Sequence, residues 1–260
     1  MSEYNQAIGP IAFVGAGPGD VELITVKGRR LLDNAGCIVY AGSLVNPAIL
    51  AGCKAEIHDS AGMDLDAIIE TMATAWRHGL SVVRLHTGDP SIFGAIKEQM
   101  QRLDALDIPY LVVPGVSSAF GTAAALKAEL TLPEIAQTVI ITRQEGRTPV
   151  PDLEKLRLLA THQTTMLIFL SVSMIETVVL ELLAGGYPQD TPVAVVEKAT
   201  WEDERIVMGT LADIAGKIRE AGISKTAMIC VGRVFADLPI TAASKLYDKE
   251  FSHGSRTAQG

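Results

Sequence analysis

The sequence has 260 residues, of which 48% are hydrophobic and 20% charged, and its formal net charge at pH 7 is −8. This length suits one large or two ordinary domains, and the composition is that of a packed soluble protein rather than a disordered one. No apolar run is long enough to span a bilayer, and the first residues lack a secretion signal, so we expect a cytoplasmic protein with no membrane partner. The acidic charge disfavours nucleic acid as a partner.

The chain offers little for metal or redox chemistry. Its three cysteines, Cys37, Cys53 and Cys230, are far apart and form no C-x-x-C pair. Cys37 and Cys230 lie in apolar, strand-like runs, which favours small buried thiols. The five histidines show no metal-ligand spacing, so we expect no metal site.

Short β-branched runs alternate with helical patterns in the first half of the chain. We predict strands over 11–14, 37–40, 55–58, 82–85 and 110–113, and helices over 26–34, 65–78 and 91–106. In the second of these helices, Ile68, Met72 and Trp76 repeat every four residues and form one apolar stripe. This alternation predicts an α/β fold whose first sheet is mostly parallel.

A second α/β series follows a helical run over 118–128. We predict strands over 138–142, 165–170, 192–196, 206–208 and 227–232, and helices over 152–160, 174–184 and 212–221. A hairpin-like pair around 201–204 predicts that the second sheet is mixed. The domains we expect are an N-terminal tail (1–10), an N-terminal α/β domain (11–116), a C-terminal α/β domain (117–240) and a polar, disordered tail (241–260).

A glycine-rich loop, Gly15-Ala16-Gly17-Pro18-Gly19-Asp20, follows the first predicted strand. The dinucleotide fingerprint G-x-G-x-x-G would need glycine where Asp20 stands, and a carboxylate there would face the pyrophosphate. Pro18 also removes a backbone N–H from a place where an anion needs donors. The strand over 37–40 ends without the carboxylate that would bind a ribose hydroxyl. A dinucleotide-dependent oxidoreductase is therefore kept only as the alternative from another class.

Two more loops of small residues, 87–94 and 114–118, follow predicted strands. Asp89 suits an N-cap, and Pro90 suits the first turn of the helix predicted over 91–106. Ligands of open α/β sheets bind at the carboxyl ends of the strands, so the three loops can converge on one crevice. None of them carries the lysine of a P-loop, which disfavours phosphoryl transfer. Their backbone groups suit a neutral or zwitterionic ligand with an adenosine part.

Three stretches, VGAGPGDVELIT, HTGDPSIFGA and PGVSSAFGTAAA, resemble the tetrapyrrole methylase family, whose members use S-adenosylmethionine to methylate the corrin precursor ring. ITRQEGRTPVP and EKATWEDERIV look most like members that methylate C11 of precorrin-4 or cobalt-precorrin-4. The resemblance implies two α/β domains with the cofactor in the cleft between them, a tetrapyrrole substrate and a homodimer. Another ring methylase of the family, such as a uroporphyrinogen methylase, stays open as an alternative.

The resemblance also implies roles for single residues at matching positions. Those that it places at the cofactor are Pro18, Thr87, Gly88, Asp89, Ile92, Phe93, Ser117, Ser118, Leu170, Ala199, Ala227 and Met228. A tetrapyrrole substrate carries several carboxylates, which arginine forks bind better than lysine does. We therefore predict substrate recognition by Arg143 and Arg147.

Other charged residues have a less defined place. Arg84, His86, Lys198 and Arg205 could add to the positive field of the two arginines. We name no catalytic base, because each candidate for that role has an ordinary structural explanation; the candidates are Asp89, His58 and Glu145.

Overall fold

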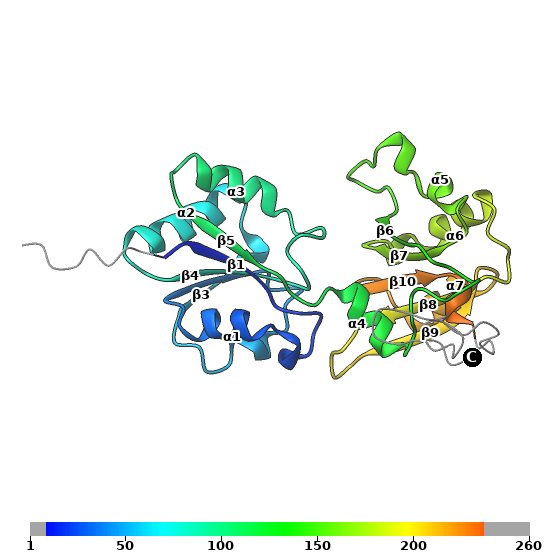
Figure 1. Cartoon of the computed structure of the whole chain (residues 1–260), viewed down its shortest axis with the longest axis horizontal. Helices are drawn as coiled ribbons and strands as arrows, with labels where there is room; N and C mark the ends of the chain where they lie inside the picture. The colour runs from blue at the N-terminus through cyan, green and yellow to red at the C-terminus, as the bar shows by residue number, and fades with distance from the viewer. Residues whose placement is uncertain (1–8, 237–260) are drawn as a thin grey trace, which may run out of the picture. The chain divides into compact units, whose positions relative to one another are not determined.

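The structure, a computed structural model, describes residues 9–236 (Figure 1). By packing, the described chain divides into two units, 9–122 with 198–204, and 123–197 with 205–236. The domain boundary expected from the sequence, between residues 116 and 117, stays a prediction. The expected tail 241–260 lies outside the described residues, as do residues 1–8 of the expected tail 1–10.

The first unit is built on an all-parallel sheet with the strand order β3-β2-β4-β1-β5. Its strands are β1 (Ile11–Gly15), β2 (Cys37–Tyr40), β3 (Glu56–Asp59), β4 (Val82–His86) and β5 (Tyr110–Val113). The interior strand β1 is buried along its whole length, because helices cover both faces of the sheet. The prediction of a mostly parallel first sheet is confirmed.

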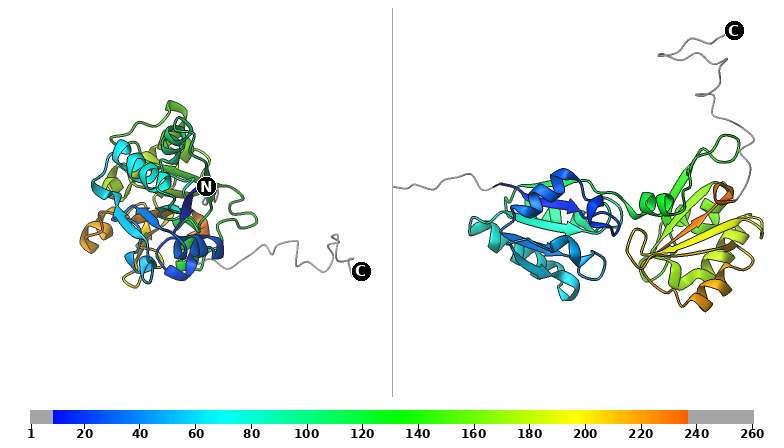
Figure 2. Two further views of the ribbon diagram at one scale, coloured as in Figure 1. Left: turned by 90° about the vertical axis from the view of Figure 1, so that its left-hand side faces the viewer. Right: turned by 90° about the horizontal axis from the view of Figure 1, so that it is seen from below.

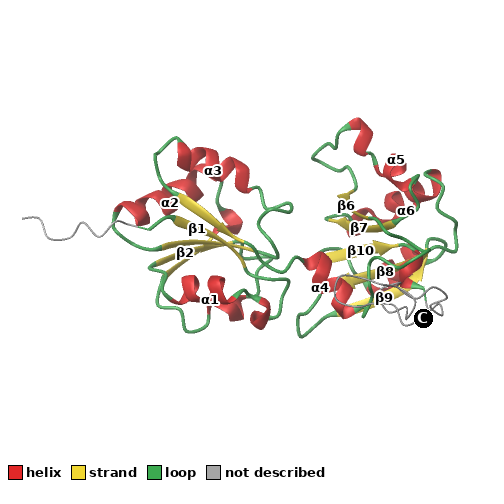
Figure 3. Cartoon of the chain, viewed as in Figure 1, coloured by secondary structure: helices red, strands yellow, loops and turns green. Residues whose placement is uncertain are grey.

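The helices of this unit lie on opposite faces of the sheet, as Figure 3 shows. They are α1 (Val26–Asp33), α2 (Leu65–Arg77) and α3 (Ile96–Asp104). Val14 of β1 packs in one core with Leu32 of α1, whereas Phe13 packs in another core with Met72 of α2 and Leu103 of α3. The chain therefore passes to α1 on one face after β1, and to α3 on the other face after β4. Because β1 and β4 are neighbours in the sheet, a topological switch point lies between them.

The helix expected over residues 91–106 is shorter in the structure. α3 begins only at Ile96, because the backbone is left-handed at Phe93 (φ 54°) and Ala95 (φ 48°). Asp89 caps a single turn instead of a helix, with Oδ1 accepting from the Ser91 N–H at 2.8 Å. Residues 87–95 therefore form a loop at the carboxyl end of β4.

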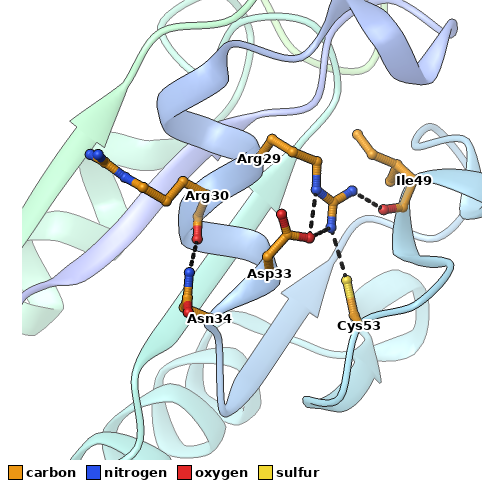
Figure 4. Close-up of polar contacts among 6 residues, drawn as sticks. All are labelled: Arg29, Arg30, Asp33, Asn34, Ile49 and Cys53. Atoms are coloured by element: carbon orange, nitrogen blue, oxygen red, sulfur yellow. Dashed lines mark hydrogen bonds and ion pairs between the residues drawn. The ribbon is translucent and has the colours of Figure 1, made fainter.

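Arg29 ties α1 to the connection between β2 and β3 (Figure 4). Its guanidinium donates to the Ile49 carbonyl at 2.7 Å and to Cys53 Sγ at 3.2 Å, and it pairs with Asp33 one turn along the helix. Ile49 belongs to a 3-10 helix, Pro47–Leu50, whose N-cap is Asn46. These contacts hold the turn that carries Asn46 against α1.

The second unit contains a mixed sheet with the strand order β6-β7-β10-β8-β9, as expected. Its strands are β6 (Val139–Arg143), β7 (Thr165–Phe169), β8 (Pro192–Glu197), β9 (Arg205–Thr210) and β10 (Ala227–Val231). Only β6 and β7 pair in parallel. One face is covered by α5 (Leu156–Ala160), α6 (Ile175–Ala184) and α7 (Ile214–Ala221), as Figure 2 shows. The remaining helix, α4 (Ser118–Ala125), crosses the division of the chain.

The predicted buried thiols are present. Cys37 in β2 and Cys230 in β10 are both buried, and burial raises the pKa of Cys37 to about 11.

Within residues 9–236, no three His, Cys, Asp or Glu side chains are grouped so that they could hold a metal ion. Over the same residues, every helix is too short or too polar to cross a membrane.

Candidate functional site

Three loops meet at the carboxyl ends of β1, β4 and β5. Gly17 and Gly88 exchange two backbone hydrogen bonds, of 3.3 and 2.8 Å, which join the loop after β1 to the loop after β4. Asp89 Oδ2 accepts from the Gly115 N–H at 2.9 Å and joins the loop after β5 to the same group. Because this edge includes the switch point between β1 and β4, it is where an open α/β sheet binds a ligand.

Glycine at two positions allows these backbones to approach so closely. A Cβ on Gly115 would lie 2.2 Å from the Gly88 carbonyl oxygen, and a Cβ on Gly15 would lie 2.6 Å from the Gly115 Cα. Both obstacles are backbone atoms, which cannot swing aside as the end of a side chain can. Only residues without a Cβ therefore permit this packing of three loops.

Asp89 is the polar centre of the three loops. Its Oδ1 accepts from both the backbone N–H and the hydroxyl of Ser91, while Oδ2 accepts from Gly115. Burial alone would raise the pKa of Asp89, but the hydrogen bonds from Ser91 and Gly115 outweigh it and hold the pKa below its usual value. Since both oxygens already accept hydrogen bonds within the protein, the geometry favours a structural role over proton abstraction.

Residues 198–204, the tip of the β8–β9 hairpin, pack with the first unit rather than with the sheet that carries them. Trp201 Nε1 donates to the Pro18 carbonyl at 2.9 Å, and the Asp20 N–H donates to Thr200 Oγ1 at 3.0 Å. The loop after β1 is also held by Asn46, whose Nδ2 donates to the Gly19 carbonyl at 2.9 Å.

Three residues that hold the loop after β1 were not predicted from the sequence: Asn46, Thr200 and Trp201. The contact between Trp201 and Pro18 spans 183 residues, so no local pattern could predict it. The one signal available was a lone tryptophan in an otherwise acidic turn, Trp201-Glu202-Asp203-Glu204.

The structure divides the predicted cofactor residues between the two units. Those in the first unit are Pro18, Thr87, Gly88, Asp89, Ile92, Phe93, Ser117, Ser118 and Ala199. Leu170, Ala227 and Met228 belong to the second unit. Leu170 follows β7 in a left-handed conformation (φ 54°) with 60% of its surface exposed, whereas Met228 is a buried residue of β10. The roles of all twelve stay predictions.

The two arginines predicted to bind substrate belong to the second unit, Arg143 as the last residue of β6 and Arg147 in the loop after it. Arg143 Nη2 donates to the carbonyls of Thr148 and Pro149, both at 3.2 Å, and so closes its own loop. Arg147 is exposed and makes no hydrogen bond or ion pair with any residue in the described range. A guanidinium has five N–H donors, so Arg143 keeps donors for a carboxylate.

Arg84 and His86, considered above as part of a positive field, are buried side chains of β4. Arg84 donates to Gln99 Oε1 at 3.1 Å and to Ser60 Oγ at 3.1 Å. Burial, together with the charge of Arg84, lowers the pKa of His86 to about 3, so its ring is neutral at pH 7. The expectation that these two residues present positive charge to a substrate is therefore corrected.

The other two members of that group are ion-paired. Lys198 pairs with Asp203, and Arg205 pairs with Glu197. Each therefore has a neighbouring carboxylate that offsets its charge.

Comparison with known proteins places the chain in a family. The family model of the tetrapyrrole (corrin/porphyrin) methylases matches residues 10–215. The chain is 58% identical to the cobalt-precorrin-4 C(11)-methyltransferase of Methanocaldococcus jannaschii over 95% of each protein. It is 48% identical to the precorrin-4 C(11)-methyltransferase of Pseudomonas aeruginosa, with 94% of this chain and 97% of that protein covered.

Solved structures of the same family have the same fold. The X-ray structure of a cobalamin biosynthetic enzyme, cobalt precorrin-4 methyltransferase, superimposes with a TM-score of 0.85 and is 48% identical, covering 87% of this chain and 96% of that one. Uroporphyrin-III C-methyltransferase from Thermus thermophilus, complexed with S-adenosylhomocysteine, gives a TM-score of 0.73 at 30% identity over 87% of this chain and 93% of that one. The chain belongs to the tetrapyrrole (corrin/porphyrin) methylases.

Proposed function

We propose that this protein is an S-adenosylmethionine-dependent methyltransferase that methylates C11 of precorrin-4 or cobalt-precorrin-4. The observation that carries the proposal is the 58% identity, over 95% of both chains, to a relative that bears this name. Identity to the uroporphyrin-III methyltransferase is much lower, at 30%, which favours precorrin-4 chemistry over that alternative. A homodimer in the cytoplasm is part of the same proposal.

The loops of the first unit fit S-adenosylmethionine better than a dinucleotide. Residues 15–20, 87–95 and 114–118 contain no lysine or arginine that could offset a diphosphate. Asp20 stands at the third glycine position of the dinucleotide fingerprint and caps the next turn, with Oδ1 accepting from the Glu22 N–H at 2.9 Å. Backbone groups and small side chains remain as partners, and these suit the amino-acid and ribose parts of a zwitterionic ligand.

In this proposal each unit holds part of the cofactor. Thr87, Gly88 and the Ser117–Ser118 pair would hold the methionine and ribose portion, with Pro18 and Ala199 beside it. Leu170, Ala227 and Met228 would meet the adenine side. When bound, the cofactor supplies a methyl group on a positively charged sulfur, and a site of low polarity favours its transfer because that charge disappears.

The protein's remaining task is to orient the substrate. A ring carbon with enamine character is already nucleophilic, so alignment and exclusion of water provide the acceleration that the proposal requires. Arg143 and Arg147 would bind peripheral carboxylates of the tetrapyrrole and fix which ring carbon meets the methyl group.

The test is an assay of the purified protein with S-adenosylmethionine and each of three substrates: precorrin-4, cobalt-precorrin-4 and uroporphyrinogen III. We expect one added methyl group on a precorrin-4 substrate by mass spectrometry, with its position at C11 assigned by NMR. Methylation of uroporphyrinogen III alone would contradict the proposal and identify the protein as a uroporphyrinogen methylase of the same family. Reduction of a nicotinamide cofactor in place of methyl transfer would revive the oxidoreductase alternative.

A further inference from the structure

We infer that Trp201 is a positioning residue of the cofactor site, which acts by fixing the loop after β1 from the tip of the β8–β9 hairpin. The inference rests on the proposed function, because it takes that loop as part of the S-adenosylmethionine site. Two segments carry the contact: the hairpin tip, Lys198–Glu204, and the first loop, residues 16–20.

Trp201 contacts the first loop through both its polar atom and its ring. The indole N–H donates to the Pro18 carbonyl at 2.9 Å. The ring lies against Gly19 so closely that a Cβ there would be 2.0 Å from Trp201 Cδ1. Gly19 has no positive φ that would demand glycine, so the ring is what excludes a side chain at this position.

The rest of the hairpin tip supports the same contact. The Asp20 N–H donates to Thr200 Oγ1, so two consecutive residues of the tip bind the first loop. A Cβ on Gly121 would lie 2.8 Å from Pro18 Cγ and 3.5 Å from Thr200 Cγ2, which places the proline ring and the threonine methyl against one glycine. Together with Asn46, these side chains bind three consecutive residues of the first loop.

The hairpin tip has a strained backbone that its own side chains maintain. Lys198 (φ 50°) and Thr200 (φ 70°) are left-handed, and a positive φ is exceptional for a β-branched residue such as threonine. Glu204 Oε2 accepts from the Thr200 N–H at 2.6 Å, and Lys198 pairs with Asp203 while its Nζ lies 5.6 Å from the Trp201 ring. A strained backbone of this kind persists only where several surrounding interactions hold it in place, and it is common at functional sites that must be preorganised.

The first loop depends on these external contacts. Pro18 has no backbone N–H, and the loop's bonds to β4 and the loop after it are made through Ala16 and Gly17. Without Trp201, the segment from Pro18 to Asp20 would adopt more conformations, and the ligand would have to order it on binding. Trp201 therefore strengthens cofactor binding without a need to touch the cofactor.

The first experiment measures the dissociation constant for S-adenosylhomocysteine by calorimetry on the full-length protein. W201F keeps an aromatic ring but loses the N–H, and we expect it to bind about fivefold more weakly, as the loss of one hydrogen bond implies. W201A should bind more weakly still.

The matched control is W76F, which removes the chain's other tryptophan. Trp76 lies in α2, its Nε1 donates to the Gly9 carbonyl, and the W76F protein should bind like wild type.

A second experiment separates positioning from a general loss of stability. G19A alone should weaken binding, because the new Cβ collides with the indole ring. When G19A is combined with W201A the collision is gone, so the two effects should be strongly non-additive. In the W76F protein, Trp201 is the only indole, and its fluorescence should change when S-adenosylhomocysteine binds.

The outcomes are distinct. If wild type binds S-adenosylhomocysteine and both Trp201 variants bind it equally well, the positioning role is overturned while the proposed function stands. If wild type does not bind the ligand, the proposed function fails and this inference fails with it. If W201A does not fold, the positioning role is tested by two remaining measurements. These are the dissociation constant of W201F and the change in Trp201 fluorescence when the W76F protein binds S-adenosylhomocysteine.

Discussion

At the scale of single residues, Asp89 combines a lowered pKa with bonds to two loops, and this makes a pH-dependent prediction. Its folded pKa lies below the ordinary value of 3.8, so its stabilising effect is present above that value and is lost as pH falls through the folded pKa. We expect D89N to reduce the free energy of unfolding at pH 7 by about 1–3 kcal/mol, the usual value of hydrogen bonds to a charged group. Urea unfolding at pH 7 and pH 3 checks this, and the difference from wild type should shrink at pH 3.

His86 makes a prediction of the same sign, because its pKa is also lowered, in this case by burial and by the charge of Arg84. The folded pKa of about 3 lies below the ordinary value of 6.5. The contribution of neutral His86 to the free energy of unfolding is therefore fully present above pH 6.5 and is lost progressively as pH falls toward 3. The slope contributed by one such group is up to about 1.4 kcal/mol per pH unit. H86F cannot take up a proton and keeps a ring to stack on Phe13. Its free energy of unfolding should therefore fall less than that of wild type between pH 6.5 and pH 5, and equal slopes would contradict the assignment.

The arginines at the end of β6 give a kinetic prediction. R143A should raise the KM for the tetrapyrrole and also loosen its own loop, since Arg143 binds two carbonyls there, whereas R147A should raise KM alone. We expect about a tenfold rise for R147A, as the loss of one charge-assisted contact implies. R30A is the matched control, because Arg30 is an exposed arginine of α1 whose side chain points away from its neighbours in Figure 4. A rise in the KM for S-adenosylmethionine instead would contradict a role in substrate recognition.

At the scale of elements, strands were predicted well because short apolar, β-branched runs mark them, and β1 and β4 are buried along their whole length. The expected strand over 110–113 is β5 as observed, and the expected strand over 11–14 is one residue shorter than β1. The helix over 91–106 failed for a physical reason. Phe93 and Ala95 adopt left-handed conformations that neither residue type favours, so tertiary packing rather than local preference sets the start of α3.

The packing of the three loops makes a prediction about glycine. G115A should destabilise the protein and weaken binding of S-adenosylhomocysteine, because its Cβ would lie 2.2 Å from a backbone oxygen. G216A is the matched control in α7, where a Cβ would meet nothing within 4 Å. That substitution should stabilise the helix by about 0.5–1 kcal/mol. Thermal unfolding of both variants checks the contrast, and a G115A protein as stable as G216A would show that the loops can separate at little cost.

At the scale of the whole molecule, the two packing units are not continuous in sequence, because residues 198–204 belong to the first unit while the segments on either side of them belong to the second. Residues 198–204 leave the sheet of the second unit at β8, pack with the first unit, and return at β9. The hairpin itself was predictable from the polar turn between two apolar runs. Its attachment to Pro18 and Asp20 was not, because tertiary contacts over such a separation leave no periodic trace in one sequence.

The distribution of charge over the molecule makes the last prediction, which concerns nucleic acid as a partner. Binding to a phosphate backbone requires clustered, unpaired Lys and Arg side chains. Here the net charge is −8, and within residues 9–236 eight Lys or Arg side chains already pair with Asp or Glu. We expect no saturable binding of a fluorescent RNA hairpin below about 100 µM at 0.15 M salt, a level at which basic proteins bind nonspecifically. Fluorescence anisotropy measures this, with S-adenosylhomocysteine binding by the same sample as the control for folded protein. Micromolar RNA affinity that falls steeply with added salt would mean that a basic face forms despite the acidic composition, and the substrate would then have to be sought among nucleic acids.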